Sequence, residues 1–251
     1  MESCYVAMKV AAIVEARMSS SRLAGKVLMP IGSKNSLGHI YSRLSKVLEI
    51  SEICIATTEN QSDDIIENWA NSRGIPIYRG SENDVLSRVL GAADKLCAEI
   101  IVEITGDCPF VDPLMVDQYI AILKENDLDY ISNNIVPTYP DGFDVQVFLT
   151  EALRKSSRLA LTREEREHVT MHIRQNPQIF KSLNIVAPKP YRYPEISVTL
   201  DTKEDLEVLR LIAENFKDLD LPSHMQIIDF LLTNPEILQI NSGIDRKGYG
   251  I

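Results

Sequence analysis

Residues 17–26 combine three cations with three hydroxyl side chains, in a chain whose net charge is −10. The cations are Arg17, Arg22 and Lys26, and the hydroxyls belong to three consecutive serines that include Ser20. A guanidinium offers a planar fork to phosphate oxygens, whereas an ammonium offers a mobile point charge. Hydroxyls and loop amides add neutral donors. The pattern predicts an exposed loop that binds phosphate groups, and the alternative is an ordinary solvated loop.

Two familiar phosphate-binding loops do not fit this segment. In a Walker A loop, Ser or Thr follows Gly-Lys and another glycine stands five positions earlier, but here Val27 follows Gly25-Lys26 and the earlier glycine is missing. The chain also lacks the GxGxxG fingerprint of dinucleotide-binding folds. The loop therefore predicts phosphate recognition without specifying the nucleotide.

Two aspartates stand where predicted buried strands end. Asp107 follows the strand at 100–104, within a Gly-Asp-Cys-Pro turn, and Asp201 follows the strand at 196–200. From spacing alone, Asp107 would cap its own turn and Asp201 would cap the helix that follows it. Both nevertheless lie at the edge where parallel sheets place their ligands.

His168 and His172 are four positions apart on a predicted helix, beside Glu167. That spacing can hold a metal ion. In a zincin, however, a glutamate directly follows the first histidine, and Val169 stands there in this chain. A metal centre formed by the two histidines is therefore disfavoured.

Apolar runs and helical periodicities alternate along the first half of the chain. Short buried strands are predicted at 10–14, 52–57, 75–78 and 100–104. Helices are predicted at 37–48, 62–72, 85–96 and 114–123. This alternation is typical of an α/β fold with a mostly parallel sheet and helices on both faces. Such sheets bind their ligands beyond the carboxyl ends of the strands, where the basic loop and Asp107 lie.

The second half is less regular. Strands are predicted at 143–148, 179–186 and 196–200, and a last helix at 223–232. Capping boxes at Thr162 with Glu165 and at Thr202 with Asp205 predict two helix starts, and the first of these helices should reach about residue 174. The tail at 241–251 contains three glycines and is predicted to be irregular.

Length and composition indicate a globular chain that folds without disulfides. The 251 residues are 45% hydrophobic and 25% charged, with 26 Lys plus Arg against 36 Asp plus Glu. This acidic balance disfavours non-specific binding to nucleic acid or anionic membranes. The four cysteines show no CxxC spacing, and no apolar run reaches about 18 residues. No apolar segment with a small-residue cleavage site stands near Glu2, so we do not expect a secretory signal. We expect a cytoplasmic protein with neither a nucleic-acid nor a membrane partner.

The basic loop resembles the signature R-x-x-S-x-R-x-P-x-K of the CMP-sugar synthetases, which include acylneuraminate and 3-deoxy-manno-octulosonate cytidylyltransferases. Arg17, Ser20, Arg22 and Lys26 match it, and Ala24 replaces the proline. The resemblance is closer to the branch of spore-coat polysaccharide biosynthesis protein F. Segments similar to that branch follow in order at 79–86 (RGSENDVL), 106–109 (GDCP), 139–148 (YPDGFDVQVF), 166–170 (REHVT) and 200–206 (LDTKEDL).

The resemblance implies a Rossmann-like nucleotidyltransferase core that forms a single domain over residues 1–251. A subregion at 133–190 would be inserted into this core and would contribute to the acceptor site and to homodimer contacts. The implied reaction transfers CMP from CTP to an acidic, nonulosonic-acid-like sugar and releases pyrophosphate. Its product would enter the biosynthesis of a surface polysaccharide or glycan.

The resemblance also implies roles for individual side chains. The nucleotide would be bound by Ala16, Arg17, Ser20, Arg22, Lys26, Arg79 and Gly106. The catalytic group would be Arg17, Arg22, Lys26 and Asp107, with Asp107 and Asp201 holding a Mg²⁺ ion. The acceptor would be bound by Asp141, Asp144, Glu167 and His168. From their positions at a predicted helix start, Arg79 and Arg88 could reach a phosphate or the acceptor carboxylate, and the alternative for either is a surface position.

Two other functions stay open at the level of the sequence. A metal-dependent glycosyltransferase has a similar core but normally carries a D-x-D cluster, and the D-x-D at 127–129 follows a helix rather than a clear strand end. A non-catalytic nucleotide-binding protein would keep the basic loop but show no turnover. Only the CMP transfer that the resemblance implies would release pyrophosphate from CTP, so this release distinguishes it from both alternatives.

Overall fold

A seven-stranded sheet forms the centre of the described part of the molecule. The computed structural model describes residues 8–219 and 221–246, and its sheet has the order β5-β4-β1-β6-β8-β7-β9. The strands are β1 (Val10–Glu15), β4 (Ile50–Thr58), β5 (Ile77–Gly80), β6 (Ile100–Thr105), β7 (Tyr130–Ser132), β8 (Gln146–Leu149) and β9 (Ser182–Asn184). The first four are parallel, β8 is antiparallel to β6 and β7, and β9 pairs parallel with β7. The predicted mostly parallel sheet is therefore confirmed.

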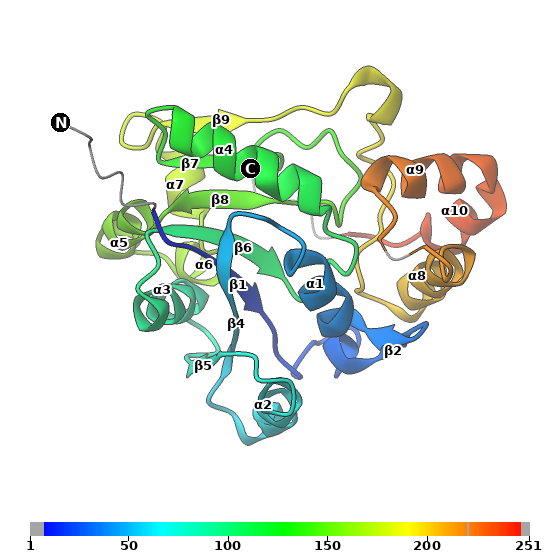
Figure 1. Cartoon of the computed structure of the whole chain (residues 1–251), viewed down its shortest axis with the longest axis horizontal. Coiled ribbons are helices and arrows are strands. Elements are labelled where there is room, and N and C mark those ends of the chain that lie inside the picture. Colours follow the sequence, from blue (N-terminus) through cyan, green and yellow to red (C-terminus); the bar gives the residue numbers. More distant parts are fainter. Residues whose placement is uncertain (1–7, 220, 247–251) are drawn as a thin grey trace.

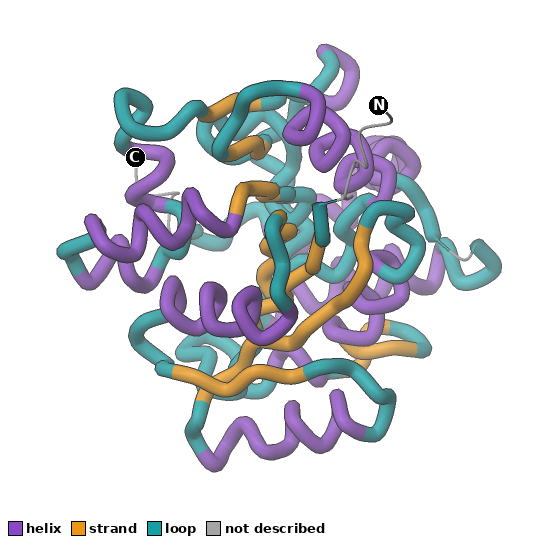
Figure 2. Tube along the Cα trace, turned by 60° about the vertical axis from the view of Figure 1, so that its left-hand side comes forward, coloured by secondary structure: helices purple, strands orange, loops and turns teal. Residues whose placement is uncertain are grey.

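The central strand β1 is apolar on both faces, as expected of a strand that helices cover on both sides. Val10, Ala12 and Val14 belong to one hydrophobic core, whereas Ala11 and Ile13 belong to another. The first core is closed by α1 (Ser36–Leu44), α2 (Asp64–Asn71) and α4 (Pro113–Glu125), and the second by α3 (Val85–Leu96) and α5 (Thr150–Leu159). Figure 1 and Figure 2 show these two groups of helices on either side of the twisted strands.

A third hydrophobic core lies in the C-terminal part. It is formed by α8 (Lys203–Asn215), α9 (His224–Thr233) and α10 (Pro235–Asn241), together with Ile31, Phe143 and the segment 196–200. These helices form a separate group beside the sheet (Figure 1). The smaller elements are the hairpin of β2 (Pro30–Ile31) and β3 (Lys34–Asn35), the helices α6 (Arg163–Glu167) and α7 (Met171–Gln175), and the 3-10 helices η1 (Lys26–Leu28), η2 (Gln61–Asp63) and η3 (Lys189–Tyr191).

Several helices begin where capping residues were predicted. The two capping boxes, Thr162 with Glu165 and Thr202 with Asp205, are both formed. Asp112 caps α4 by accepting a hydrogen bond from the second residue of that helix. Local sequence thus determines where these helices start, because the capping side chains satisfy backbone N–H groups that have no partner within the helix.

Two predicted elements differ from the structure, and both differences affect the candidate site. The helix predicted from the first capping box to about residue 174 is interrupted, and α6 and α7 are its two parts. The interruption occurs where Val169 and Thr170 are buried and Thr170 donates a hydrogen bond to Gln146. The strand predicted at 196–200 is an extended buried segment with one isolated bridge, between Asp141 and Ser197.

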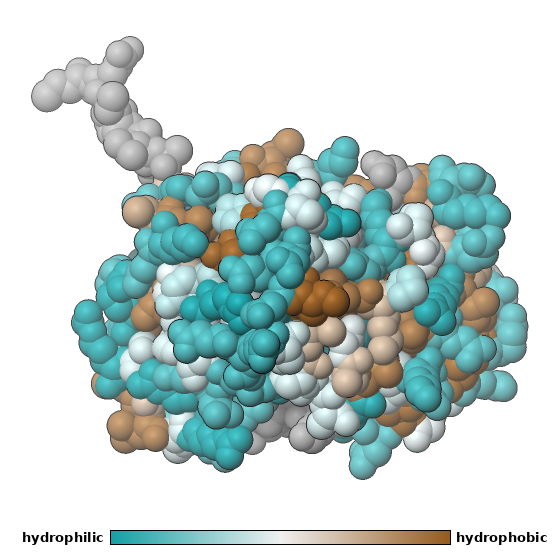
Figure 3. All heavy atoms as spheres, turned by 90° about the horizontal axis from the view of Figure 1, so that it is seen from below, coloured by the Kyte–Doolittle hydropathy of each residue, from teal (hydrophilic) through white to brown (hydrophobic). Residues whose placement is uncertain are grey.

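The face seen from below Figure 1 is mostly hydrophilic, with separate small apolar areas (Figure 3). Among the described residues, no helix combines the length and the apolar character needed to cross a membrane. The tail predicted to be irregular is described as far as residue 246. The predictions made for residues 1–7 and 247–251 lie outside the described residues.

Candidate active site

Two hollows meet at the carboxyl ends of β1 and β6. The loop pocket has a volume of about 330 Å³ and is lined mainly by side chains of residues 15–27, together with Arg88. The inner pocket has a volume of about 470 Å³ and is lined by residues of β6 and β8 and by the segment 194–199. Both pockets are lined by Glu15, Thr105, Asp107, Glu167, His168 and Asp201. They are therefore two compartments of one site.

Lys26 lies between two carboxylates at this junction. Its Nζ atom is 2.7 Å from Asp107 Oδ2 and 2.7 Å from Asp201 Oδ1, and Arg22 contacts Asp201 Oδ2 at 2.8 Å. Burial lowers the pKa of the Lys26 ammonium, but the two carboxylates outweigh burial and raise this pKa above its usual value. For Asp107 the effects have the opposite sign. Burial raises the pKa of its carboxyl group, but the Lys26 ammonium outweighs burial and holds this pKa below the usual range. Lys26 and Asp107 therefore favour their charged forms together.

A sharp turn of the basic loop brings Lys26 inward. Gly25 has a φ of +71°, a left-handed conformation that favours glycine, and its N–H donates to the Met18 carbonyl at 2.9 Å. Helix η1 then begins at Lys26, which is only 9% exposed. The predicted exposed position is correct for Arg22 but wrong for Lys26, because a tight turn encloses the lysine between the ends of two distant segments.

Asp107 is held by the close packing of its neighbour Gly106 on β1. The Gly106 N–H donates to the Glu15 carbonyl at 2.7 Å, and Ser36 Oγ donates to the Gly106 carbonyl at 2.6 Å. A Cβ atom at position 106 would lie 2.6 Å from the Glu15 carbonyl oxygen, so only glycine fits there. The Gly-Asp-Cys-Pro turn therefore fixes the carboxylate beside the basic loop.

Asp201 reaches Asp107 because their two segments are hydrogen-bonded to each other. The Leu200 N–H donates to the Asp107 carbonyl at 2.9 Å. The predicted alternative role of Asp201 as a helix cap is wrong, since Thr202 is the N-cap of α8. The Asp201 carboxylate instead contacts Lys26 and Arg22 in the site.

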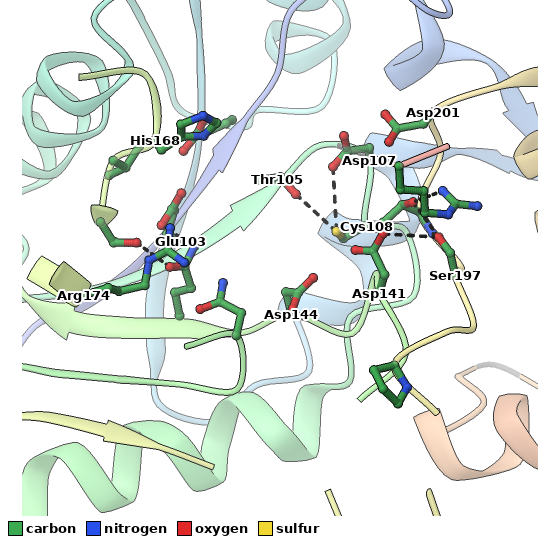
Figure 4. Close-up of a pocket in the computed structure, with 18 of the residues that line it drawn as sticks. Glu103, Thr105, Asp107, Cys108, Asp141, Asp144, His168, Arg174, Ser197 and Asp201 are labelled. Carbon is green, nitrogen blue, oxygen red and sulfur yellow. Dashed lines mark hydrogen bonds between the residues drawn. The ribbon is translucent and has the colours of Figure 1, made fainter. Parts of the chain in front are cut away.

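The inner pocket is lined by the four side chains predicted to bind the acceptor, Asp141, Asp144, Glu167 and His168. Figure 4 shows the two aspartates and the histidine on opposite sides of this space. Gly142, between the aspartates, has a φ of +105°, and a Cβ atom there would come within 2.8 Å of the backbone of Val198. The turn that presents both aspartates therefore requires glycine.

The interruption between α6 and α7 separates the two histidines. His168 follows the end of α6 and lines both pockets. His172 is buried, with its Nδ1 2.5 Å from Glu165 Oε1. The prediction of one helix carrying both side chains is therefore wrong, and the two histidines have different surroundings. Within the described ranges, no group of three or more His, Cys, Asp and Glu residues is arranged to hold a metal ion.

The site also contains polar side chains that the sequence patterns did not single out: Glu15, Glu103, Gln146, Arg174 and Arg246. Glu15 was detectable, because it directly follows a predicted buried strand at the ligand-binding edge. Arg246 gave no local signal. Its position depends on the packing of the C-terminal helices, where its NH2 group is 2.7 Å from the buried carboxylate of Asp205.

Arg79, predicted to bind the nucleotide, lines neither pocket. Its NH1 atom lies 2.6 Å from carboxylate oxygens of Asp64 and Glu67, and its other nitrogens donate to two backbone carbonyls. The neighbouring Arg88 is buried instead and lines the loop pocket, with NH2 3.9 Å from Glu15 Oε2. The structure thus brings Arg88 to the site and holds Arg79 against α2.

Residues 11–226 match a family model described as cytidylyltransferase. The chain belongs to the cytidylyltransferase family. Spore coat polysaccharide biosynthesis protein SpsF of Bacillus subtilis is 33% identical, over 89% of this chain and 94% of its own. A solved cytidylyltransferase of Leptospira borgpetersenii superposes with a TM-score of 0.88 at 31% identity, covering 95% of this chain and 100% of the other. A 3-deoxy-manno-octulosonate cytidylyltransferase of Geobacter sulfurreducens is 28% identical, over 53% of this chain and 58% of its own.

This membership confirms the resemblance that the sequence motifs indicated, and with it the enzyme class. The cytidylyltransferase is a CTP-dependent nucleotidyltransferase on a Rossmann-like core. Neither of the other two functions weighed from the sequence is supported by the family.

The donor set at the junction fits the Mg²⁺ ion that the resemblance implies for this cytidylyltransferase. In nucleotide-binding sites Mg²⁺ takes one or two carboxylates and completes its coordination with phosphate oxygens and water. Asp107 and Asp201 each direct one oxygen to the same point, which the Lys26 ammonium occupies at 2.7 Å from both. A cation held there would replace the ammonium between the same two oxygens.

Arg79→Ala should leave the affinity of this cytidylyltransferase for CTP within about threefold of the unaltered protein. Its partners in the structure are surface carboxylates and carbonyls outside both pockets. Losing such surface ion pairs lowers the free energy of unfolding by only about 0–1 kcal/mol, so the fold should also persist. Calorimetric titration with CTP measures the effect, with Arg22→Ala as the comparison expected to lose affinity. A tenfold loss in Arg79→Ala would instead support the predicted role in nucleotide binding.

Proposed function

We propose that this cytidylyltransferase transfers CMP from CTP to a hydroxyl of an acidic, nonulosonic-acid-like sugar, releasing pyrophosphate, for the biosynthesis of a surface polysaccharide or glycan. One observation carries the proposal. Lys26, Asp107 and Asp201 meet where a pocket built from the basic loop joins a pocket lined by the predicted acceptor residues. A bond between a nucleotide and an acceptor would form at such a junction.

In this proposal the loop pocket holds CTP. The groups that would surround its phosphates are Ala16, Arg17, Ser20, Arg22, Lys26 and Gly106. Guanidinium, ammonium, hydroxyl and amide donors together neutralise and orient a triphosphate. Nucleotidyl transfer needs little covalent chemistry from the protein, because positioning and charge stabilisation supply most of the rate enhancement.

We place the Mg²⁺ ion of this reaction at Asp107 and Asp201. When bound, it would neutralise negative charge on the phosphate oxygens. Because Lys26 contacts the same two carboxylates, a bound ion would free its ammonium for the triphosphate. Asp107, which the backbone around Gly106 holds rigidly, would be the main protein ligand.

The inner pocket would bind the sugar. Asp141, Asp144 and Glu167 offer carboxylate oxygens that accept hydrogen bonds from sugar hydroxyls, while Arg174 and Arg246 offer guanidinium groups for a sugar carboxylate. The acidic class of sugar is also supported by the relatives. One of them is named a 3-deoxy-manno-octulosonate cytidylyltransferase, and another is named a polysaccharide biosynthesis protein.

We further propose that the enzyme is a homodimer, with contacts in the subregion 133–190. Strand β9 ends the sheet on this side. Val136, Leu183 and Val186 expose 57%, 37% and 47% of their surface in the same subregion. A sheet edge with exposed apolar side chains is suited to pairing with another chain. Sedimentation equilibrium of the full chain measures the assembly state.

CTP should release pyrophosphate at least about tenfold faster than ATP, GTP or UTP when the protein is mixed with Mg²⁺ and a panel of acidic sugars. The basic loop recognises phosphate alone, so this preference has to come from contacts with the base. A coupled pyrophosphate assay measures all four nucleotides. Equal release from each would contradict the choice of cytidine, and CTP binding without turnover on any sugar would contradict the proposed acceptor class.

A further inference from the structure

A buried carboxylate without an assigned role stands at the junction of the two pockets. Glu15 is the last residue of β1 and lines both of them. Its side chain is 15% exposed, and its Oε2 lies 3.9 Å from Arg88 NH2. Its Oε1 is buried and has no hydrogen-bond partner among the described residues. Buried carboxylate oxygens are normally paired, and an unpaired one on a side chain that lines both pockets points to a role of Glu15 in the site.

Glu103, on the neighbouring strand β6, faces the same inner pocket (Figure 4) and is held by a chain of hydrogen bonds. Glu103 is 4% exposed and accepts a hydrogen bond from Gln146 Nε2 at 2.8 Å. The Gln146 Oε1 atom accepts from Tyr130 OH at 2.7 Å and from Thr170 Oγ1 at 2.6 Å. These two hydroxyl donors fix the orientation of the amide, and the amide in turn fixes Glu103.

Glu103 is the member of the pair that carries a proton. Burial, together with the neighbouring Glu15 carboxylate, raises the pKa of Glu103 well above its usual range. Glu103 therefore favours its neutral form, and Glu15 lies beside the Arg88 guanidinium.

We propose that Glu15 accepts the proton of the acceptor hydroxyl during CMP transfer, an inference that rests on the proposed function. The hydroxyl oxygen forms a bond to the α-phosphorus of CTP while its proton moves to the Glu15 carboxylate. The bond between the α-phosphorus and the bridging oxygen breaks, and pyrophosphate leaves with that electron pair. The proton then passes from Glu15 to solvent. Positioned bases of this kind contribute roughly 10²–10⁴-fold to a rate.

The charged and titratable groups around Glu15 come from each element that borders it. They are Arg17 of the basic loop, Arg88 of α3, Glu103 of β6, Asp107 after β6, Glu167 and His168 at the end of α6, Arg174 of α7, and Asp201 before α8. The surroundings of the Glu15 carboxylate therefore contain both positively and negatively charged side chains. A carboxylate accepts a proton only in its charged form, so a rate that depends on this transfer should rise with pH.

Glu15→Gln tests the proposal, with Glu103→Gln as the matched control. Glu15→Gln should lower the single-turnover rate of CMP transfer about 10²-fold and remove the rise of this rate on the acidic side of the pH profile. The Kd for CTP should stay within about threefold, because the phosphate-binding groups are unchanged. Glu103→Gln should retain the rate within about threefold, because a neutral amide replaces a neutral acid of similar shape. Radiolabelled CTP reports the rates, and thermal unfolding reports the fold.

An unchanged rate and pH profile in Glu15→Gln would overturn the proposal. An equal loss of rate in Glu103→Gln would do the same, since it would give the pair a structural role only. If Glu15→Gln does not fold, Glu15→Asp decides. Its shortened carboxylate should slow transfer about tenfold while the pH dependence stays, and an unchanged rate would contradict a role in proton transfer.

The proposed acceptor class can fail independently of this inference. If no acidic sugar releases pyrophosphate with the unaltered protein, the acceptor class is wrong. The role of Glu15 is then judged on the slow attack of water on CTP, which forms CMP and pyrophosphate and also requires a proton acceptor. Glu15→Gln should lower this CMP release and Glu103→Gln should not, and equal release from both would overturn the role of Glu15.

Discussion

Asp107→Asn should abolish CMP transfer and leave the fold intact. The amide keeps the size of the side chain, and its oxygen still accepts a hydrogen bond from Lys26 Nζ, which is 2.7 Å away in the structure. The substitution removes the negative charge that a hard cation such as Mg²⁺ requires. Turnover across a titration of Mg²⁺ measures the loss, and thermal unfolding checks the fold. Activity that recovers at high Mg²⁺ would indicate weakened binding of the ion, whereas normal activity at low Mg²⁺ would contradict the assignment.

Asp201→Asn should also lower turnover and weaken the dependence of nucleotide binding on Mg²⁺. Because Thr202 caps α8, a loss of activity in this variant cannot be attributed to a lost helix cap. The carboxylate contacts Lys26 and Arg22 in the site, and an asparagine keeps one acceptor oxygen for them. Full activity with unchanged Mg²⁺ dependence would leave Asp107 as the one metal carboxylate of the pair.

Asp112→Asn is the matched control for both aspartates. Asp112 is buried but lines neither pocket, and its Oδ2 lies 2.6 Å from His224 Nδ1. The substitution should lower the free energy of unfolding by about 1–3 kcal/mol, the range for weakening hydrogen bonds to a buried charged group, with turnover nearly unchanged. If Asp112→Asn lost as much turnover as Asp107→Asn, loss of a buried carboxylate would disturb the whole fold, and the metal assignment would fail.

The first half of the fold could be predicted because its signals are local. β1 is apolar on both faces, so its sequence alone predicts a strand covered on both sides. Capping side chains such as Asp112 fix helix starts within a few residues. The Gly-Asp-Cys-Pro turn was recognisable from four consecutive residues, although the contact that requires its glycine is made with the distant strand β1.

The second half was harder because its structure depends on distant contacts. The sequence predicted a strand near 143–148, but it carried no signal that β8 pairs antiparallel between β6 and β7. The segment 196–200 is extended because it bonds to Asp107 and Asp141, and no alternating pattern encodes these partners. The helix expected to carry both histidines is interrupted where Val169 and Thr170 are buried, and helical periodicity does not reveal such a tertiary cause.

The candidate site shows the same division. Residue types identified the basic loop and the two aspartates, and their positions at strand ends explain why they lie near one another. Spacing could not show that Lys26 is buried between Asp107 and Asp201, because the turn at Gly25 and the pairing of two remote segments create that position together. The burial of Lys26 gives its substitution a different expected outcome from that of an exposed arginine in the same loop.

Lys26→Met should lower kcat with CTP by about 10²–10³-fold, the usual effect of removing one oriented charge-stabilising group. Methionine keeps most of the apolar stem, so the substitution removes the charge with little change in packing. Asp107 and Asp201 would then face each other without the ammonium that neutralises both. Because the cluster is only partly buried, the free energy of unfolding should fall by about 1–3 kcal/mol, between the values for surface and fully buried ion pairs.

Mg²⁺ separates the two effects of Lys26→Met. If Asp107 and Asp201 form a metal site, added Mg²⁺ should restore the thermal stability of the variant by replacing the missing positive charge, while turnover stays low because the triphosphate still lacks its ammonium. Lys34→Met is the matched control, because Lys34 Nζ contacts Ser42 Oγ at 3.3 Å outside both pockets, and it should change neither property. Thermal unfolding with and without Mg²⁺, beside steady-state kinetics, measures both. A stability that does not respond to Mg²⁺ would argue against ion binding by the two carboxylates, and normal turnover would leave Lys26 with a structural role alone.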